Sequence, residues 1–312
     1  VAPMDKTHIE EIPLLIDEFG ITSFKIFMFY GGHGLHGASS NQHEFLMIGE
    51  DEKYDIAHFE FVMRGVQKAM TEYPEKQEDI SLSLHCETAE IMAAYTKLVQ
   101  NENTLEGLHA YSASRPPHSE GLAIFIASYL ANETNLPNVN LLHLSSKKAV
   151  DAALQMQQVF PHINFRREVT IGHLMLDVDA ATGNLAKVNP PIRPREDVEY
   201  LWENLLANNI DWVVSDHACC KHEDKVDVEN PGDIWLAKSG FGGTEYLMSA
   251  LVSEGSKRGL SFNKMAELTS YNPARRYGLH SKGDIETGLD ADLVLVDPNE
   301  TWTIKSSESE SG

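Results

Sequence analysis

Short apolar runs rich in β-forming residues alternate along this chain with longer segments whose apolar residues recur at helical spacing. Such runs, bounded by turn-forming residues, are typical of buried strands. They predict five strands, at residues 21–30, 79–87, 139–146, 163–170 and 210–217. The other segments predict helices at residues 9–19, 56–73, 89–100, 119–131, 147–159, 195–207, 245–257, 262–268 and 271–279, with a loop at 109–117. Strands that alternate with helices form parallel sheets of βαβ units, so we expect an α/β fold.

The C-terminal part of the chain breaks this alternation. The run DADLVLVD predicts a last strand at residues 290–297, and the serine-rich segment 306–312 predicts a disordered tail.

Four ionisable side chains lie in the predicted strands or at their ends. His85, His143 and Asp216 each follow an apolar run, and Lys25 lies within the first run. In a (β/α)₈ barrel the carboxyl ends of the strands form the active face. A single strand histidine is more often a packed core residue, but four such groups in four βα units favour a shared site.

These residue types point to a divalent metal ion. Neutral imidazole is a good zinc ligand, and an acidic residue such as Asp216 can bind a metal and accept a proton from its water. Burial depresses the pKa of a lysine, and a neutral amine can react with CO₂ to form an anionic carbamate that bridges two metals. The alternative for Lys25 is an ion pair with a carboxylate at the mouth of the site.

The charge of the chain excludes two classes of partner. Its 312 residues carry 25 Lys and Arg against 47 Asp and Glu, a formal net charge of −22. Nucleic acids and anionic membranes are bound through basic surfaces, so we expect neither as a partner. No apolar stretch approaches the ~20 residues of a membrane span. The three cysteines form no disulfide framework, which indicates a reducing compartment and predicts a cytoplasmic protein.

Seven segments together resemble the cyclic-amidohydrolase branch of the amidohydrolase superfamily, which contains hydantoinases (dihydropyrimidinases), allantoinases and dihydroorotases. In order they are GITSFKIFMFY, SLHCE, GLHAYSASRPP, NLLHLSS, KVNPPIRPRED, VVSDHA and GLDADLVLVD. The resemblance implies a (β/α)₈ TIM barrel with a small β-sandwich, and a binuclear metal centre, usually zinc. It implies that Lys25 is the carbamylated lysine that bridges the metals and that His85 and His143 bind the second metal. Asp216 would bind the first metal and act as general base and then acid.

The resemblance also implies residues that contact the substrate. Tyr30 follows Lys25 at the spacing of a hydantoinase tyrosine that stabilises the oxyanion, and the alternative is an ordinary strand-end aromatic. Asn189 lies where the branch places a substrate-binding Asn or Ser, or it forms a turn before Pro190. Gly242, in the segment GFGG, offers backbone groups to the ring.

Several other residues lie near these motifs, but the sequence does not determine their function. Arg115 and Arg193 are candidates for binding a substrate carboxylate, with a structural role as the more frequent alternative. The glycine-rich segment with His33, His36 and His43 is interpreted as a lid rather than a metal site. We interpret His217 as a supporting residue, and Cys219 and Cys220 as packing or loop residues.

One element of the family pattern is missing, because no His-x-His pair, which would hold the first metal on the first barrel strand, occurs in this sequence. The resemblance places the five predicted strands at barrel positions four to eight. We therefore expect an N-terminally truncated barrel without strands one to three at residues 1–280, and a remnant of the β-sandwich with a tail at 281–312. The alternative is a relative that has lost the first metal's ligands. Open sheet edges favour association, and we expect a homo-oligomer.

The function that follows is hydrolysis of a small cyclic amide or ureide, as in hydantoinases and dihydropyrimidinases. Dihydroorotase and allantoinase activities are the close alternatives, because the Asn-Pro-Pro form resembles dihydroorotases whereas KIFMFY resembles hydantoinases. The alternative of another class is a non-catalytic, amidohydrolase-like scaffolding protein. Retention of Lys25, His85, His143 and Asp216 together argues against it.

Overall fold

The computed structural model describes residues 1–28, 54–179, 183–226, 229–305 and 308–310. The predicted lid with His33, His36 and His43, the candidate Tyr30 and much of the predicted tail lie outside the described residues. No helix within the described ranges is long and apolar enough to cross a membrane.

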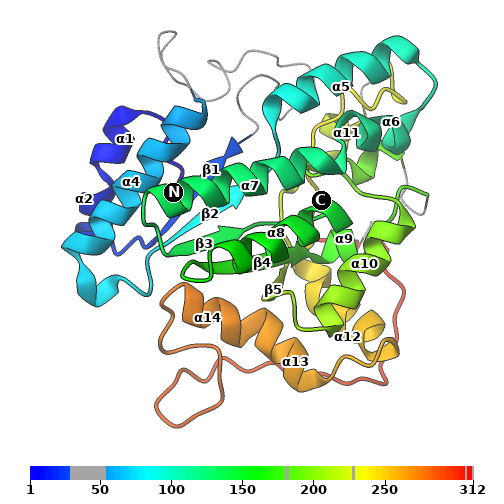
Figure 1. The fold of residues 1–312 in the computed structure, drawn as a ribbon. Coiled ribbons are helices and arrows are strands. Elements are labelled where there is room, and N and C mark those ends of the chain that lie inside the picture. The colour runs from blue at the N-terminus through cyan, green and yellow to red at the C-terminus, as the bar shows by residue number, and fades with distance from the viewer. Residues whose placement is uncertain (29–53, 180–182, 227–228, 306–307, 311–312) are drawn as a thin grey trace.

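A five-stranded parallel sheet forms the centre of the molecule (Figure 1). Its strands are β1 Ser23–Phe27, β2 Ser81–His85, β3 Asn138–Leu141, β4 Asn164–Thr170 and β5 Trp212–Val214. Four of them lie inside a predicted run, and β3 begins one residue before its run, so all five strand predictions are confirmed. The spatial order β1-β2-β3-β4-β5 follows the chain. A sheet wound in one direction is the pattern of a barrel wall, whereas doubly wound sheets reverse their order in the middle.

Helices connect and cover the strands (Figure 1). The α-helices are α1 Lys6–Glu10, α2 Ile12–Phe19, α4 Ile56–Glu72, α5 Ala89–Glu102, α6 Gly107–Ser114, α7 Pro117–Glu133, α8 Lys147–Val159, α9 Ile171–Met175, α10 Arg195–Leu206, α11 His222–Lys225, α12 Leu247–Lys257, α13 Phe262–Ala266 and α14 Asn272–Arg276. Short 3₁₀ turns occupy Pro74–Lys76, Gly183–Ala186 and Thr244–Tyr246, and a π-helical turn occupies Glu267–Tyr271.

Three predictions of local structure are wrong. The segment 109–117, predicted as a loop, contains most of α6, whose Leu108 and Tyr111 are buried. The predicted helix 9–19 is two helices, because Pro13 has no N–H to continue the first and is suited to the first turn of the second.

The third wrong prediction is the strand at 290–297, where the described chain forms no strand. Leu295 is 97% exposed, so this apolar run has no neighbouring strand to pair with and no surface to cover it. The charges beside it pair locally instead, with Lys282 contacting both Asp290 and Asp292.

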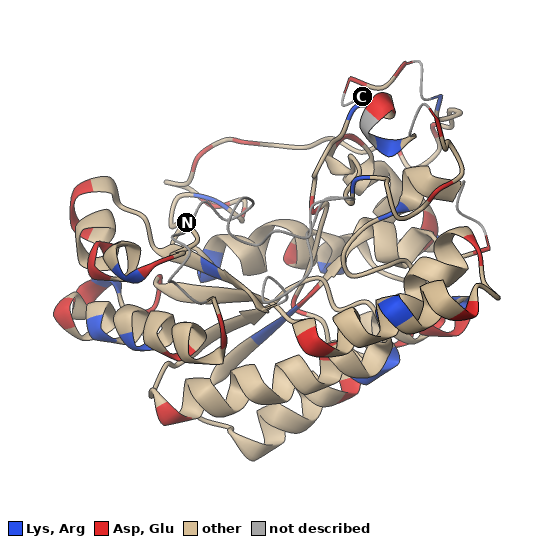
Figure 2. Cartoon of the chain, turned by 90° about the horizontal axis from the view of Figure 1, so that it is seen from above, with Lys and Arg blue, Asp and Glu red and all other residues tan. Residues whose placement is uncertain are grey.

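The core lies between the strands and the helices outside them. Every residue of β2 and β3 is buried, which a parallel sheet covered on its faces requires. Charged residues are spread over the outer helices and loops, while most of the sheet is uncharged (Figure 2).

The amino ends of β3 and β4 are tied together by Arg276 of α14. Its guanidinium donates to the side-chain oxygens of Asn138 and Asn140 at 3.0 and 2.6 Å, and to the carbonyls of Val139 and Asn164 at 3.1 and 2.6 Å. Arg276 is only 5% exposed. We call this group the Arg276 cluster; it closes the end of the sheet opposite the candidate site.

Candidate metal centre

The four predicted metal-binding residues lie within or just after β1, β2, β3 and β5, three of them at the carboxyl edge of the sheet. Lys25 is the central residue of β1, and His85 is the last residue of β2, paired in register with Phe27. His143 follows the end of β3 by two residues, and Asp216 follows the end of β5 by two. The two residues just past their strands, His143 and Asp216, have positive φ angles of 34° and 47°. This strained backbone turns their side chains at the ends of the strands, a feature that concentrates at functional sites.

His143 is the clearest sign of an absent ligand. Its side chain is buried, at 2% exposed, and neither ring nitrogen has a hydrogen-bond partner among the residues that the structure describes. Burial, followed by His85 and Lys25, holds the pKa of His143 well below its usual range, so the ring is neutral. Buried polar atoms are nearly always satisfied, and a neutral imidazole with free nitrogens is suited to a metal ion.

His85 lies beside His143, with their ring centroids 4.2 Å apart. The Nε2 atom of His85 is 2.7 Å from Oε2 of Glu87, which is itself fully buried. Burial also holds the pKa of His85 well below its usual range, and the charges of Lys25 and Arg115 act in the same direction. A carboxylate bound to one nitrogen of a histidine fixes its tautomer and orientation, as is common for metal ligands.

Lys25 and Asp216 act on each other through their charges. Burial lowers the pKa of Lys25, while Asp216 and Glu168 oppose the shift. Burial raises the pKa of Asp216, and Lys25 opposes that shift. A lysine whose ammonium form is disfavoured is more reactive as an amine, and an aspartate with a raised pKa is better able to carry a proton.

Glu168, a buried carboxylate of β4, was not among the candidates predicted from the sequence. It accepts hydrogen bonds from Nε1 of Trp212 at 2.7 Å and from the backbone N–H of His143 at 3.1 Å. Burial raises the pKa of Glu168 to about 7. An acidic residue inside an otherwise β-forming run was the available signal.

The donor types fit a metal ion, and the fit is best at the pair His85–His143. Within the described ranges, however, no group of three or more His, Cys, Asp or Glu side chains is placed to hold a metal. The described residues therefore provide a histidine pair with an open side, rather than a closed ligand set.

A second polar group lies near Asn189, the predicted substrate-binding residue. Its side-chain oxygen accepts a short hydrogen bond from the Tyr111 hydroxyl and a second, at 3.3 Å, from Ser239. Its Nδ2 atom is buried and has no partner in the described part of the chain, and the residue is 7% exposed. Gly242 lies in the loop just after Ser239, and it is half-buried.

The two candidate arginines have protein partners. Arg193 is 1% exposed and donates to Glu120 at 2.8 Å and to Ser145 at 3.0 Å. Arg115 donates to Glu87 at 3.2 Å. These contacts favour the structural alternative over binding of a substrate carboxylate.

The remaining candidates lie beyond β5. His217 accepts hydrogen bonds from the backbone N–H groups of Gly243 and Thr244, at 3.3 and 3.4 Å. Cys219 is exposed, and the Cys220 thiol lies against three backbone carbonyls. Their geometry agrees with supporting and loop roles.

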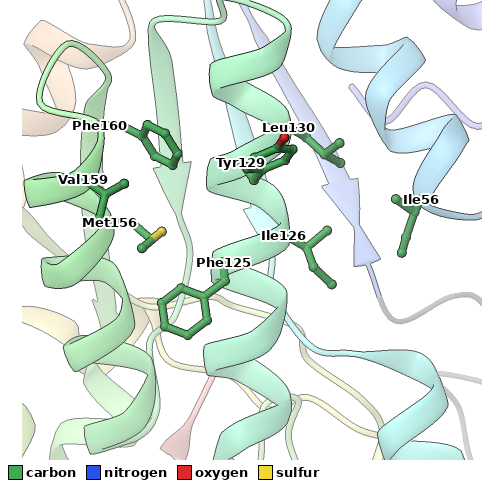
Figure 3. Close-up of a pocket in the computed structure, with 8 residues that line it drawn as sticks. All are labelled: Ile56, Phe125, Ile126, Tyr129, Leu130, Met156, Val159 and Phe160. Atoms are coloured by element: carbon green, nitrogen blue, oxygen red, sulfur yellow. The ribbon is translucent and has the colours of Figure 1, made fainter.

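An apolar pocket of about 560 Å³ lies away from these residues, on the helical layer between α7 and α8 (Figure 3). Its described lining includes Phe125, Tyr129, Val159 and, from α4, Ile56. That lining contains no carboxylate, imidazole or amine, so it offers no group for metal binding or proton transfer.

Comparison with known proteins now gives the family. The model of the amidohydrolase family matches residues 55–310. The chain belongs to the amidohydrolase family. An allantoinase of Rubrobacter xylanophilus is 36% identical over 247 residues, which cover 77% of this chain and 52% of that protein. An allantoinase of Salmonella gallinarum is 30% identical over 299 residues, which cover 95% of this chain and 59% of that protein. The chain thus spans about half the length of the curated relatives that it matches.

Solved structures support the same fold. The L-hydantoinase (dihydropyrimidinase) of Arthrobacter aurescens has a TM-score of 0.76 at 26% identity, over 93% of this chain and 58% of that one. A dihydroorotase of Saccharomyces cerevisiae has a TM-score of 0.59 at 13% identity, over 87% of this chain and 64% of that one, and so shares the fold alone. The predicted family and the α/β fold are confirmed.

Proposed function

We propose that this chain carries the catalytic face of a metal-dependent hydrolase that opens the ring of a cyclic amide or ureide. The observation that carries the proposal is His143, whose two buried ring nitrogens lack partners beside His85 at the carboxyl edge of the sheet. The membership in the amidohydrolase family and the resemblance to allantoinases and hydantoinases support the reaction class. The five strands would correspond to strands four to eight of the family barrel, and residues 281–312 to part of its small β-domain.

His85 and His143 would hold the second metal of the family site, with Lys25, as its carbamate, as a further ligand. Asp216 would be a ligand on the side of the first metal. The proposed metal is zinc, which suits imidazole and carboxylate donors. When bound, it would act as a Lewis acid toward the ring carbonyl and provide a nucleophile at neutral pH.

Other residues of the chain would transfer the proton and bind the substrate. Asp216 would accept the proton of the attacking water and deliver it to the ring nitrogen as the C–N bond breaks, a role that its raised pKa favours. Asn189 would donate its free N–H to a ring carbonyl. Tyr30 and Gly242 stay predicted substrate contacts.

The first substrate to test is allantoin, because relatives at 36% and 30% identity are allantoinases. Hydantoin and dihydrouracil follow, because hydantoinases share the fold, and dihydroorotate is the last of the close alternatives. The second candidate function, a non-catalytic scaffold, is disfavoured by the retained set of metal-binding residues. We also propose a cytoplasmic setting, supported by three free cysteines, and a homo-oligomer.

The deciding experiment combines metal content with turnover. The chain is dialysed against zinc, its zinc is counted, and hydrolysis of the four substrates is measured. We expect about one zinc ion per chain, turnover of at least one substrate, and loss of turnover in Lys25→Ala and Asp216→Ala. The matched controls are Lys148→Ala and Asp297→Ala, at exposed positions. Zinc binding without hydrolysis of any of the four substrates would refute the proposed hydrolase function. Two zinc ions per chain would contradict the prediction that the chain lacks ligands for the first metal.

A further inference from the structure

A series of buried polar contacts connects the candidate metal centre to Asn189. It starts at His85, whose Nε2 is 2.7 Å from Oε2 of Glu87. The same Oε2 atom accepts from Nη1 of Arg115 at 3.2 Å. The Cζ atom of Arg115 lies 5.2 Å from the centre of the Tyr111 ring, a cation–π contact. Tyr111 donates to the side-chain oxygen of Asn189.

Every member of this series is buried. Their exposed fractions run from 0% for Glu87 to 7% for Asn189. Buried polar chains of this kind are rigid, since each group loses a partner if its neighbour rotates. The orientation of the Asn189 amide is therefore set from within the protein.

The hydroxyl groups of Tyr111 and Ser239 determine the orientation of the Asn189 amide, because both need its oxygen as an acceptor. Oδ1 of Asn189 accepts from Tyr111 and from Ser239, and these two hydroxyls are 3.2 Å apart. If the amide were reversed, one of the two hydroxyl hydrogens would have no acceptor within this group, which is costly in a buried site.

Lys187 keeps Ser239 in place. Its ammonium donates to the carbonyls of Ile234 at 2.7 Å and Ala237 at 2.6 Å, and it lies 4.7 Å from the centre of the Tyr111 ring. The backbone N–H of Gly240 donates back to the Lys187 carbonyl at 2.9 Å. The loop that carries Ser239 is thus bound to the segment that carries Asn189.

We propose that Arg115, Tyr111 and Ser239 are positioning residues that hold the Asn189 amide with its oxygen inward, so that Nδ2 donates to a carbonyl oxygen of the ring substrate. The inference rests on the proposed function and narrows it, because it requires a hydrogen-bond acceptor at this point of the ring. A ring that presents only an N–H there is excluded, since two donors would face each other.

The test uses the zinc-loaded full chain, with hydantoin and allantoin as substrates. Tyr111→Phe and Ser239→Ala remove one hydroxyl each and leave the packing almost unchanged. The matched control is Tyr200→Phe, whose hydroxyl donates to Asp151 at the surface. We expect KM to rise about 5- to 10-fold in Tyr111→Phe and about 2- to 5-fold in Ser239→Ala, with kcat within about twofold of the parent.

A second readout does not depend on turnover. In protein labelled with ¹⁵N-asparagine, the Asn189 side-chain signal is identified by its loss in Asn189→Asp. Tyr111→Phe and Ser239→Ala should each shift this signal, and Tyr200→Phe should not. If the parent hydrolyses no ring while the signal shifts as expected, the proposed function fails and the positioning stands. If Tyr111→Phe matches Tyr200→Phe in KM, or leaves the Asn189 signal in place, the positioning is overturned.

Discussion

Replacing Arg193 by Met should destabilise the protein without acting on substrate recognition. Arg193 and Glu120 are 1% and 2% exposed, and the distance from Nη2 to Oε2 is 2.8 Å. Met keeps most of the volume of the arginine stem but removes the charge. The variant therefore leaves the Glu120 carboxylate in a dry site with no cation beside it.

The loss can be sized from the contacts. Breaking a buried pair by removing one partner costs about 3–5 kcal/mol, because the remaining charge is uncompensated. The Ser145 and Ser146 hydroxyls still donate to Glu120, at 2.7 and 3.0 Å, which favours the low end of that range. For a chain of this size the same loss lowers the melting temperature by about 5–8 °C.

The assay is urea unfolding at neutral pH, with Arg195→Met as the matched control. Arg195 also pairs with acidic residues, Asp177 and Glu199, but its side chain is 54% exposed. Surface pairs contribute about 0–1 kcal/mol, so the control should change little. The double variant Arg193→Met/Glu120→Gln should recover part of the loss, because it removes the unpaired charge and keeps an acceptor for the serines.

One result would refute this reasoning. If Arg193→Met unfolds at the urea concentration of the parent but raises KM for dihydroorotate and not for uncharged rings, Arg193 binds the substrate carboxylate. The structural role would then be wrong.

Three further predictions concern the site and the fold. His143→Ala should weaken zinc binding at least 10-fold in equilibrium dialysis, whereas exposed His162→Ala should not; equal affinities would remove His143 from the metal site. In metal-free protein the raised pKa of Glu168, about 7, means that this group costs stability as pH rises from its unfolded value near 4.5 through 7. Glu168→Gln should remove that loss, up to about 3 kcal/mol above pH 7, and parallel stability–pH curves of the two proteins would contradict it. Gly278→Ala should lower the melting temperature by several degrees, because φ is +68° and the added Cβ would lie 2.6 Å from the Asp79 side chain; an unchanged melting curve would show that the turn adapts.

The strands, and the positions of the candidate site residues relative to them, could be predicted because their signals are local. An apolar run that ends in His85 or Asp216 identifies both a buried strand and a polar group at its end. In a parallel sheet the carboxyl ends of neighbouring strands lie at the same edge, independently of the conformation of the loops. The sequence alone therefore placed His85, His143 and Asp216 at one edge of the sheet, and Lys25 within the first strand.

The features that could not be predicted depend on contacts with residues far away in the sequence. Tyr111 was predicted to lie in a loop, yet its hydroxyl contacts Asn189, 78 residues away. Glu168 looked like one more polar residue beside Arg166 and Arg167, and only the fold places it under Trp212 and His143. The run at 290–297 has strand composition, but composition does not supply a partner.

The Arg276 cluster separates two ways in which a variant can lose function. Its contacts close the end of the sheet opposite His143 and reach no candidate site residue through the bonds described. A change there would reduce how many molecules in a cell are folded, because clearance follows the unfolded fraction, and each surviving molecule would work normally. A change at His143 would leave the amount of folded protein unchanged and inactivate every molecule. A variant in the Arg276 cluster and a variant at His143 could then show the same total activity in a cell. Their activities per folded molecule would differ, and a measurement of the protein level would distinguish them.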